Sequence, residues 1–168
     1  TGRKRKTEIR IFDDVDVKKV VVKNSKLYVN REDGFIGTSL RREEYVEDCS
    51  DIDDIIVFTS NGDMIVTKVD SKKFVAKNIL YVSVFKKRDS RTIYNMIYKD
   101  GKSGVSYIKR FNVTGVTRDK TYNLTSQNPK TKILHFSANP NGEAEIVTIQ
   151  LRQSGSIKKL KWLSLIHI

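Results

Sequence analysis

Three stretches of the sequence end a short β-type run on positive charge. Residues 104–111 read GVSYIKRF, residues 155–162 read GSIKKLKW, and a looser copy at residues 62–68 reads GDMIVTK. In the first stretch two adjacent cations lie beside Phe111, and in the second two adjacent cations are followed by a third lysine beside Trp162. A sheet requires neither ending. Lysine and arginine at such positions bind phosphate oxygens without reading bases. The pattern therefore predicts a surface that binds a phosphate backbone.

The positive charge is concentrated toward the C-terminal side of the chain. The 168 residues carry a formal net charge of +12. Residues 1–50 hold 12 Lys and Arg against 10 Asp and Glu, whereas residues 101–168 hold 11 against 3. Clustered cations repel one another, so an anionic partner that offsets this repulsion is expected. The alternative interpretation is a surface that is charged for solubility.

The composition is that of a single domain outside the secretory route. A chain of 168 residues with 38% hydrophobic residues is long enough for one core of ordinary size. Cys49 is the single cysteine, so no intrachain disulfide is expected and a reducing compartment is favoured. No apolar run approaches the roughly 18 residues of a membrane span, and no signal peptide is recognisable. These features predict a cytoplasmic protein without a membrane partner.

Short β-branched and aromatic runs, separated by Gly, Asn, Asp and Ser, predict an all-β fold. Helical periodicity is nearly absent, and residues 41–49 are expected to form at most one helical turn. The pairs at 61–62, 100–101 and 141–142 are Asn-Gly, Asp-Gly and Asn-Gly, which predict hairpin turns. The expected strands are residues 18–23, 26–30, 35–39, 54–59, 64–70, 79–85, 92–99, 105–113, 132–137, 144–151 and 156–162.

A repeated unit underlies these strands. Apolar runs at residues 55–58, 93–96 and 145–148 each precede a turn and a strand that ends on cations, and a looser copy occupies residues 26–42. Four short strands per unit at this spacing are typical of propeller blades, which stack laterally to bury both faces. The chain holds about three such units, fewer than the roughly four to eight blades that close a propeller.

The hairpin at residues 54–69, DIIVFTSNGDMIVTKV, resembles a blade of the C-terminal domain found in the A subunit of bacterial type IIA topoisomerases, the family of gyrase and topoisomerase IV. Blades of that family pair an apolar strand with a turn of Asn or Lys plus Gly, then a strand ending in Lys or Arg. Residues 107–110 and 155–159 match this exit best. Residues 8–16, EIRIFDDVD, are similar to the linker that leaves the catalytic core. The resemblance covers nearly the whole chain up to Trp162 and rests on the repeated order of these motifs.

The resemblance implies a partial β-pinwheel, a propeller-like ring whose blades exchange strands and whose basic rim binds and bends duplex DNA. It divides the chain into a linker at residues 1–17, blades at residues 18–162 and a tail at residues 163–168 that is expected not to be native. The parent protein would be an ATP-dependent type II topoisomerase, dimeric and working with an ATPase B subunit. The catalytic tyrosine and metal-binding acids of that family belong to other domains, so this chain is expected to have no catalytic residue, no metal site and no cofactor. The residues expected to contact DNA are Arg41, Arg42, Lys68, Lys72, Lys73, Lys86, Lys87, Arg88, Lys109, Arg110, Lys158 and Lys159.

One departure separates two members of the resembled family. The gyrase A subunit carries a Gln-Arg-Arg-Gly-Gly-Lys-Gly box in its first blade, which supports tight chiral wrapping. Residues 37–50, GTSLRREEYVEDCS, contain no such box. Arg41 and Arg42 are followed by Glu43 and Glu44, whose carboxylates would repel a DNA backbone. The departure favours the topoisomerase IV type, with decatenation and relaxation rather than gyrase-type supercoiling.

Three further groups are interpreted as structural. The acidic residues between positions 43 and 54 match no ion-coordinating loop, so a solvated loop is expected. His135 has no Cys or Glu companion at ligand spacing and is expected to serve the fold. Tyr94, Tyr98 and Tyr107 lie in regular strand patterns, where packing between blades is expected.

Two other functions stay open. One is a propeller that docks a protein partner and is basic only for solubility, and the other is a single-strand binder that stacks bases on tyrosine and phenylalanine. Steep salt dependence of duplex affinity favours the duplex binder, whereas salt-insensitive protein binding favours the docking module. The basic run RKRK at residues 3–6 either touches DNA or is a solvated linker.

Overall fold

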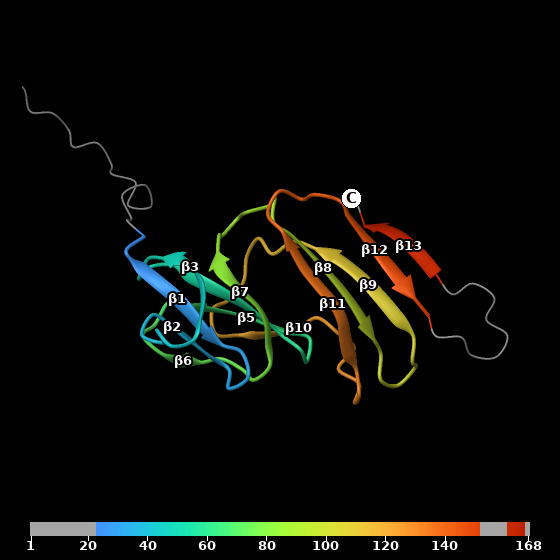
Figure 1. Cartoon of the computed structure of the whole chain (residues 1–168), viewed down its shortest axis with the longest axis horizontal. Helices are drawn as coiled ribbons and strands as arrows, with labels where there is room; N and C mark the ends of the chain where they lie inside the picture. Colours follow the sequence, from blue (N-terminus) through green and yellow to red (C-terminus); the bar gives the residue numbers. More distant parts are fainter. Residues whose placement is uncertain (1–22, 152–160, 167–168) are drawn as a thin grey trace, which may run out of the picture.

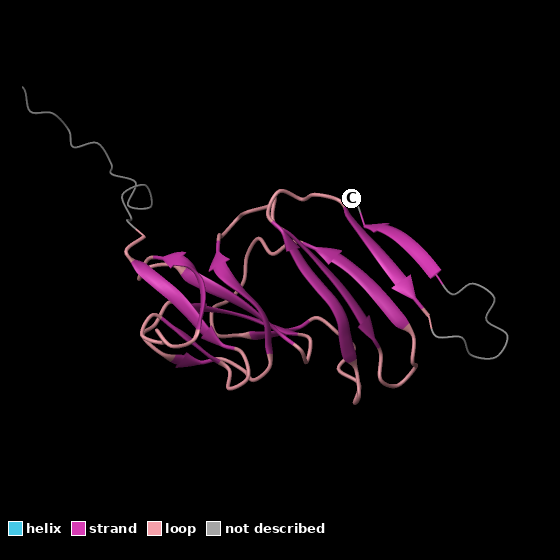
Figure 2. Ribbon diagram, viewed as in Figure 1, coloured by secondary structure: helices cyan, strands magenta, loops and turns pink. Residues whose placement is uncertain are grey.

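The computed structural model describes residues 23–151 and 161–166. Within these residues the chain forms strands and no helix, as Figure 2 shows. No helix in this part of the chain is long and apolar enough to cross a membrane. The strands are β1 (Ser25–Asn30), β2 (Phe35–Gly37), β3 (Glu44–Cys49), β4 (Asp54–Thr59), β5 (Asp63–Lys68), β6 (Lys73–Phe74), β7 (Ile79–Phe85), β8 (Ile93–Lys99), β9 (Ser106–Phe111), β10 (Thr121–Asn123), β11 (Lys132–Asn139), β12 (Glu145–Gln150) and β13 (Lys161–Ile166).

Antiparallel sheets follow one another along the long axis of the molecule (Figure 1). Each is built on a hairpin, formed in turn by β1–β2, β4–β5, β8–β9 and β12–β13. A later strand returns to the first strand of the hairpin, so that β3 pairs with β1, β7 with β4 and β11 with β8. The strand orders within the described residues are β3-β1-β2-β6, β10-β5-β4-β7, β11-β8-β9 and β12-β13.

Neighbouring sheets exchange short strands. β6 leaves the second unit and pairs with β2 of the first sheet, with Phe74 opposite Phe35. β10 leaves the third unit and pairs with β5 of the second sheet, with Thr121 opposite Ile65. Each exchanged strand supplies hydrogen-bonding partners to a sheet edge that would otherwise be exposed. Four-stranded antiparallel sheets completed in this way confirm the predicted partial β-pinwheel.

β4 has both faces buried because the second sheet lies between the first and the third. Ile55 and Val57 belong to a core cluster shared with β1 and β2. Ile56 and Phe58 alternate to the opposite face and pack in a second cluster with Tyr94 of β8. Phe58 is 1% exposed, and its ring centroid lies 4.8 Å from that of Tyr94. Burial of both faces is the lateral stacking that the repeated unit predicted.

The segment between β2 and β4 differs from its prediction. Residues 44–49 form β3 and pair with β1, so the helical turn expected at residues 41–49 is wrong. The solvated loop expected between residues 43 and 54 is wrong for β3, whereas residues 51–53 do lie in a connection between strands. The reason is tertiary. Cys49 is fully buried in the first core cluster, and Glu47 Oε1 accepts a hydrogen bond from the backbone N–H of Val84 at 2.6 Å. Local sequence preference does not register such distant partners.

The predicted turns divide into two kinds. Asn61 and Gly62 join β4 to β5, and Gly62 has a φ of 84°, so this hairpin is confirmed. The Asp100-Gly101 pair opens the connection between β8 and β9, which also form a hairpin. Asn141 and Gly142 instead connect β11 to β12, which lie in different sheets, so the hairpin predicted there is wrong. An Asn-Gly pair predicts a chain reversal but not which strands will pair.

Several expectations fall outside the described residues. These are the linker at residues 1–17, almost all of the strand at 18–23, and residues 156–160 of the last expected strand. Residues 161–166 form β13, in which Ile166 lies opposite Glu145 of β12. The interpretation of residues 163–168 as a non-native tail stays a prediction.

We expect Phe58→Ala to lower the free energy of unfolding by about 3–5 kcal/mol, because it leaves a cavity where the phenyl ring packs between the second and third sheets. Urea denaturation followed by circular dichroism measures this. Ile52→Ala is the control, since Ile52 is 52% exposed and its truncation should cost at most about 0.5 kcal/mol. Equal losses for the two variants would contradict the assigned core.

Candidate nucleic-acid interface

Four exposed cations gather at one end of the second sheet. β5 ends at Lys68, and β7 ends immediately before Lys86, Lys87 and Arg88. Both strands flank β4, so their ends lie on either side of its first residue, Asp54. We call Lys68, Lys86, Lys87 and Arg88 the cationic end. The register of the sheet therefore brings together two groups of cations that the sequence predicted separately.

The acid in the middle of the cationic end is already paired. Arg118 Nε donates to Asp54 Oδ1 at 2.7 Å. Asp54, Arg118 and Lys87 line a surface hollow of about 370 Å³. In the part of the chain that the structure describes, no ion pair joins the cationic end to an acid. Arg118 was not among the predicted residues, because it lies in a loop that shows no strand pattern.

Lys72 and Lys73 are adjacent in sequence but make different contacts. Lys73 lies in β6, and its Nζ donates to Asp119 Oδ1 at 2.7 Å and to Thr67 Oγ1 at 2.6 Å. The Lys73 ammonium holds the pKa of the Asp119 carboxyl below its usual range. Lys72 is exposed, with its Nζ 4.6 Å from the centroid of the Phe35 ring. Lys72 is therefore the member of this pair whose charge is open to an external anion.

The side chains of Lys109 and Arg110 also make different contacts. They lie within paired strand β9, and alternation sends them to opposite faces. Lys109 is exposed, and its Nζ donates to the carbonyl of Leu124. Arg110 lies opposite Asn95, and its guanidinium donates to Asn95 Oδ1 at 3.2 Å and to the carbonyl of Gly142 at 3.1 Å. If the strand ended at these two residues, both head groups could reach solvent. Strand pairing instead continues to Phe111, and the Arg110 guanidinium is bound within the fold.

Arg110 borders a polar network that joins the third sheet to β12. The Glu145 carboxylate accepts hydrogen bonds from Asn95 Nδ2 at 2.8 Å and from the hydroxyl of Ser137. Its second oxygen lies 2.9 Å from His135 Nε2. Burial raises the pKa of Glu145, but the hydrogen bonds from Ser137, Asn95 and His135 outweigh burial and hold the pKa below its usual range. In this network His135 links two sheets.

The remaining predicted contacts lie elsewhere. Arg41 and Arg42 occupy an exposed turn before β3, in the first unit. The nearby Glu44 carboxylate is bound by Arg31, whose Nε and Nη2 each donate to it at 2.7 Å. The Arg31 guanidinium holds the pKa of Glu44 below its usual range. Lys158 and Lys159 lie outside the described residues.

Comparison with known proteins connects this architecture to a family. A family model of the topoisomerase C-terminal domain of Bacteroidota matches residues 26–165. The chain belongs to this family. The match confirms the family resemblance that the strand exits carried.

The topoisomerase C-terminal domain is also similar to the A subunit of DNA topoisomerase 4 from Borreliella burgdorferi, with 32% identity over 137 residues. The alignment covers 81% of this chain and 21% of the relative, so the chain spans about a fifth of the relative's length. No solved structure matches the chain. The cations described above are therefore those of a topoisomerase C-terminal domain.

We expect Asp119→Asn in the topoisomerase C-terminal domain to lower stability at neutral pH but not in strong acid. The pKa of Asp119 is lower in the folded chain than in the unfolded one. Its contribution is therefore complete above about pH 4 and is lost as the pH falls through the folded pKa. Because the pair with Lys73 is exposed, the loss near pH 7 should not exceed about 1 kcal/mol. Urea midpoints across this range measure the effect, and a difference that persists in strong acid would contradict it.

Proposed function

We propose that this domain binds and bends duplex DNA for a type II DNA topoisomerase. The cationic end carries the proposal, because four exposed positive side chains flank the first residue of β4, Asp54, whose carboxylate is paired with Arg118. Cations arranged in this way neutralise phosphates and release counterions. Membership of the topoisomerase C-terminal domain family supports the same conclusion.

The form of the surface favours contact with the DNA backbone over reading of bases. Its side chains come from the end of β5 and from the connection after β7. Neither is a helix or a long ribbon of the kind that enters a major groove. Contacts to phosphates fix the position of a duplex but carry no sequence information. Similar affinity for unrelated duplexes is therefore expected.

Bending follows from the succession of sheets. Bending a site of about 20–30 bp by 40–90° costs on the order of 1–6 kcal/mol. Exposed cations occur on successive units along the long axis in Figure 1, with Arg41 and Arg42 on the first, the cationic end on the second and Lys109 on the third. Phosphate contacts at several points along one duplex offset the cost of bending it.

The parent protein would be a dimeric A subunit that works with an ATPase B subunit to decatenate and relax DNA. Residues 37–50 contain no Gln-Arg-Arg-Gly-Gly-Lys-Gly box, and two glutamates follow Arg41 and Arg42. This departure supports the topoisomerase IV type over gyrase-type supercoiling. The similarity to the A subunit of a DNA topoisomerase 4 supports it as well.

Neutralising the cationic end should weaken duplex binding and flatten its salt dependence. The variant combines Lys68→Gln, Lys86→Gln, Lys87→Gln and Arg88→Gln. Each lost phosphate contact should reduce the magnitude of the negative slope of log affinity against log salt by about 0.9. The effect should be similar for unrelated sequences. Fluorescence anisotropy with two unrelated duplexes, titrated at several salt concentrations, measures both quantities.

A matched control removes the same charge elsewhere on the surface. It combines Lys23→Gln, Lys26→Gln, Lys77→Gln and Lys120→Gln, all at exposed positions outside the cationic end. The control should change the slope far less. Unchanged affinity and slope in a folded cationic-end variant would overturn the proposal and favour a propeller that docks a protein partner.

We also propose that this chain holds none of the catalytic groups of its parent. Tyr94 is 4% exposed, and burial raises the pKa of its hydroxyl, so it is not available as a nucleophile. Tyr98 is 6% exposed and stacks on Tyr107 with 5.2 Å between ring centroids. Packing between blades, the role expected for all three tyrosines, is supported for Tyr94, which contacts Phe58 of the second sheet. Tyr98 and Tyr107 instead pack on each other within the third sheet.

The purified chain should leave supercoiled plasmid DNA intact in the presence of Mg²⁺ and ATP. Agarose electrophoresis after protease treatment detects any nick or covalent adduct. Reproducible nicking that disappears in Tyr107→Phe, the variant of the most exposed of the three tyrosines, would show that this chain contributes to cleavage.

A further inference from the structure

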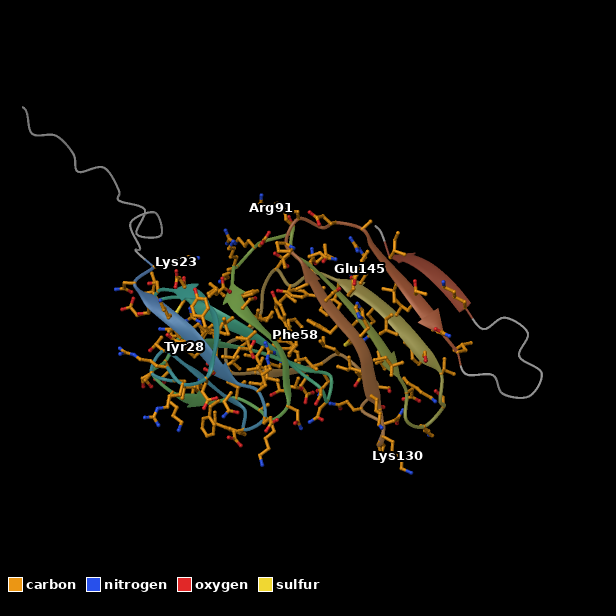
Figure 3. All side chains as sticks on the ribbon, in the orientation of Figure 1. Lys23, Tyr28, Phe58, Arg91, Lys130 and Glu145 are labelled. Atoms are coloured by element: carbon orange, nitrogen blue, oxygen red, sulfur yellow. The ribbon has the colours of Figure 1, made fainter. Side chains whose placement is uncertain are left out.

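A second group of exposed lysines surrounds a hollow at the turn end of the third sheet. Lys99, Lys102, Lys130 and Lys132 line a surface hollow of about 460 Å³, together with Leu134. We call these four residues the lysine hollow. Figure 3 shows Lys130 projecting at the lower edge of the molecule, and Lys130 lies in the connection that leads into β11. None of the four was among the residues predicted to contact DNA.

The register of the sheet forces two of these charges together. β8 ends at Lys99, β11 begins at Lys132, and the two residues lie directly opposite one another. Like charges in this position destabilise an antiparallel pair. Lys102 and Lys130 add two more charges from neighbouring connections. Among the described residues, no ion pair joins any of the four to an acid.

The two connections that border the hollow are fixed to each other through Asp100. This residue is 4% exposed. Its carboxylate accepts hydrogen bonds from the hydroxyl of Ser126, from Asn128 Nδ2 at 2.8 Å, and from the backbone N–H and the hydroxyl of Ser103 at 2.7 Å each. These bonds, led by that from Ser126, hold the pKa of Asp100 well below its usual range. Asp100 therefore orders the connections, and both of its oxygens are occupied.

The backbones of the two connections also meet closely. A Cβ added at Gly101 would lie 1.8 Å from the carbonyl oxygen of Pro129. The Gly101 N–H donates to Thr131 Oγ1 at 3.0 Å. Lys130 lies between these two contacts and has a φ of 66°, which residues other than glycine seldom adopt. The hollow is therefore bordered by backbone whose conformation is set by its neighbours.

We propose that the lysine hollow binds phosphate groups of a polyanion, either the backbone of duplex DNA or a free oligophosphate. Ammonium groups bind phosphate oxygens as compact point charges. A bound anion also removes the repulsion between Lys99 and Lys132. β7 ends on the upper side of Figure 1 and β8 on the lower side, so the hollow is a separate site from the cationic end. The inference rests on the proposed function only where DNA is the ligand.

The first test uses tripolyphosphate as the probe. The variant combines Lys99→Gln, Lys102→Gln, Lys130→Gln and Lys132→Gln in the full chain. Calorimetric titration at low salt should show tripolyphosphate affinity reduced about ten- to hundredfold, the effect of losing one or two charge-assisted hydrogen bonds. The control variant, with Gln at positions 23, 26, 77 and 120, should bind tripolyphosphate as tightly as the unmodified chain does. Equal affinity in all three proteins would overturn the inference.

A smaller variant separates loss of binding from loss of folding. Lys99→Gln with Lys132→Gln removes the opposed pair alone and should melt at a higher temperature than the unmodified chain when no anion is present. Tripolyphosphate should raise the melting temperature of the unmodified chain more than that of this variant. An equal rise in both proteins would contradict the site.

Duplex titrations then identify the source of the phosphate. If the salt dependence of duplex affinity is flatter in the lysine-hollow variant than in the unmodified chain, the ligand of the hollow is the DNA backbone. If the variant loses tripolyphosphate binding but its salt slope for duplex DNA is unchanged, the ligand of the hollow is a free oligophosphate. The inference of a phosphate site then still holds. The cationic-end variant reports separately on the proposed function, because it leaves the hollow unaltered.

Discussion

Strand exchange between neighbouring sheets is the constraint on which the rest of the structure depends. β6 contributes residues 73–74 to the first sheet and β10 contributes residues 121–123 to the second. Strands this short are stable only when they dock on an edge that is already formed. The first and second sheets are therefore complete only once the next unit has folded far enough to supply that strand. The segments on either side of an exchanged strand are consequently held by two sheets at once, including the loop that carries Lys130.

The hairpins were predictable from sequence because their information is local. β4 and β8 are nearly continuous apolar runs, as expected for strands buried on both faces, and each leads into a turn and a second strand. β6 and β10 were not predicted, since two or three residues carry no periodicity and their partners lie in the preceding unit. β3 was misread for a related reason. Its acidic residues conceal an edge strand whose last residue, Cys49, reaches the core.

The cations were predictable as a set but not in their individual roles. Lys73 pairs with Asp119, 46 positions later, and Arg110 reaches the carbonyl of Gly142, 32 positions later. Such partners are brought together by strand exchange and by the approach of β12, neither of which the local sequence reveals. Arg118 was not predicted at all, because nothing in the local sequence indicates its contact with Asp54. Counting positive charges therefore overstates the number available to an external anion.

Alternation explains how many charges remain available at each strand exit. Where two cations are adjacent in or beside a paired strand, one is bound by polar groups of the fold, as Lys73 and Arg110 are. Its neighbour, Lys72 or Lys109, stays exposed. Such an exit offers a duplex one phosphate contact rather than two, and so contributes about 0.9 to the salt slope rather than twice that. The run from Lys86 to Arg88 is different, because it lies past the end of β7, where pairing no longer fixes alternate side chains inward. Termination of the strand, more than the number of cations, therefore determines where this domain concentrates accessible positive charge.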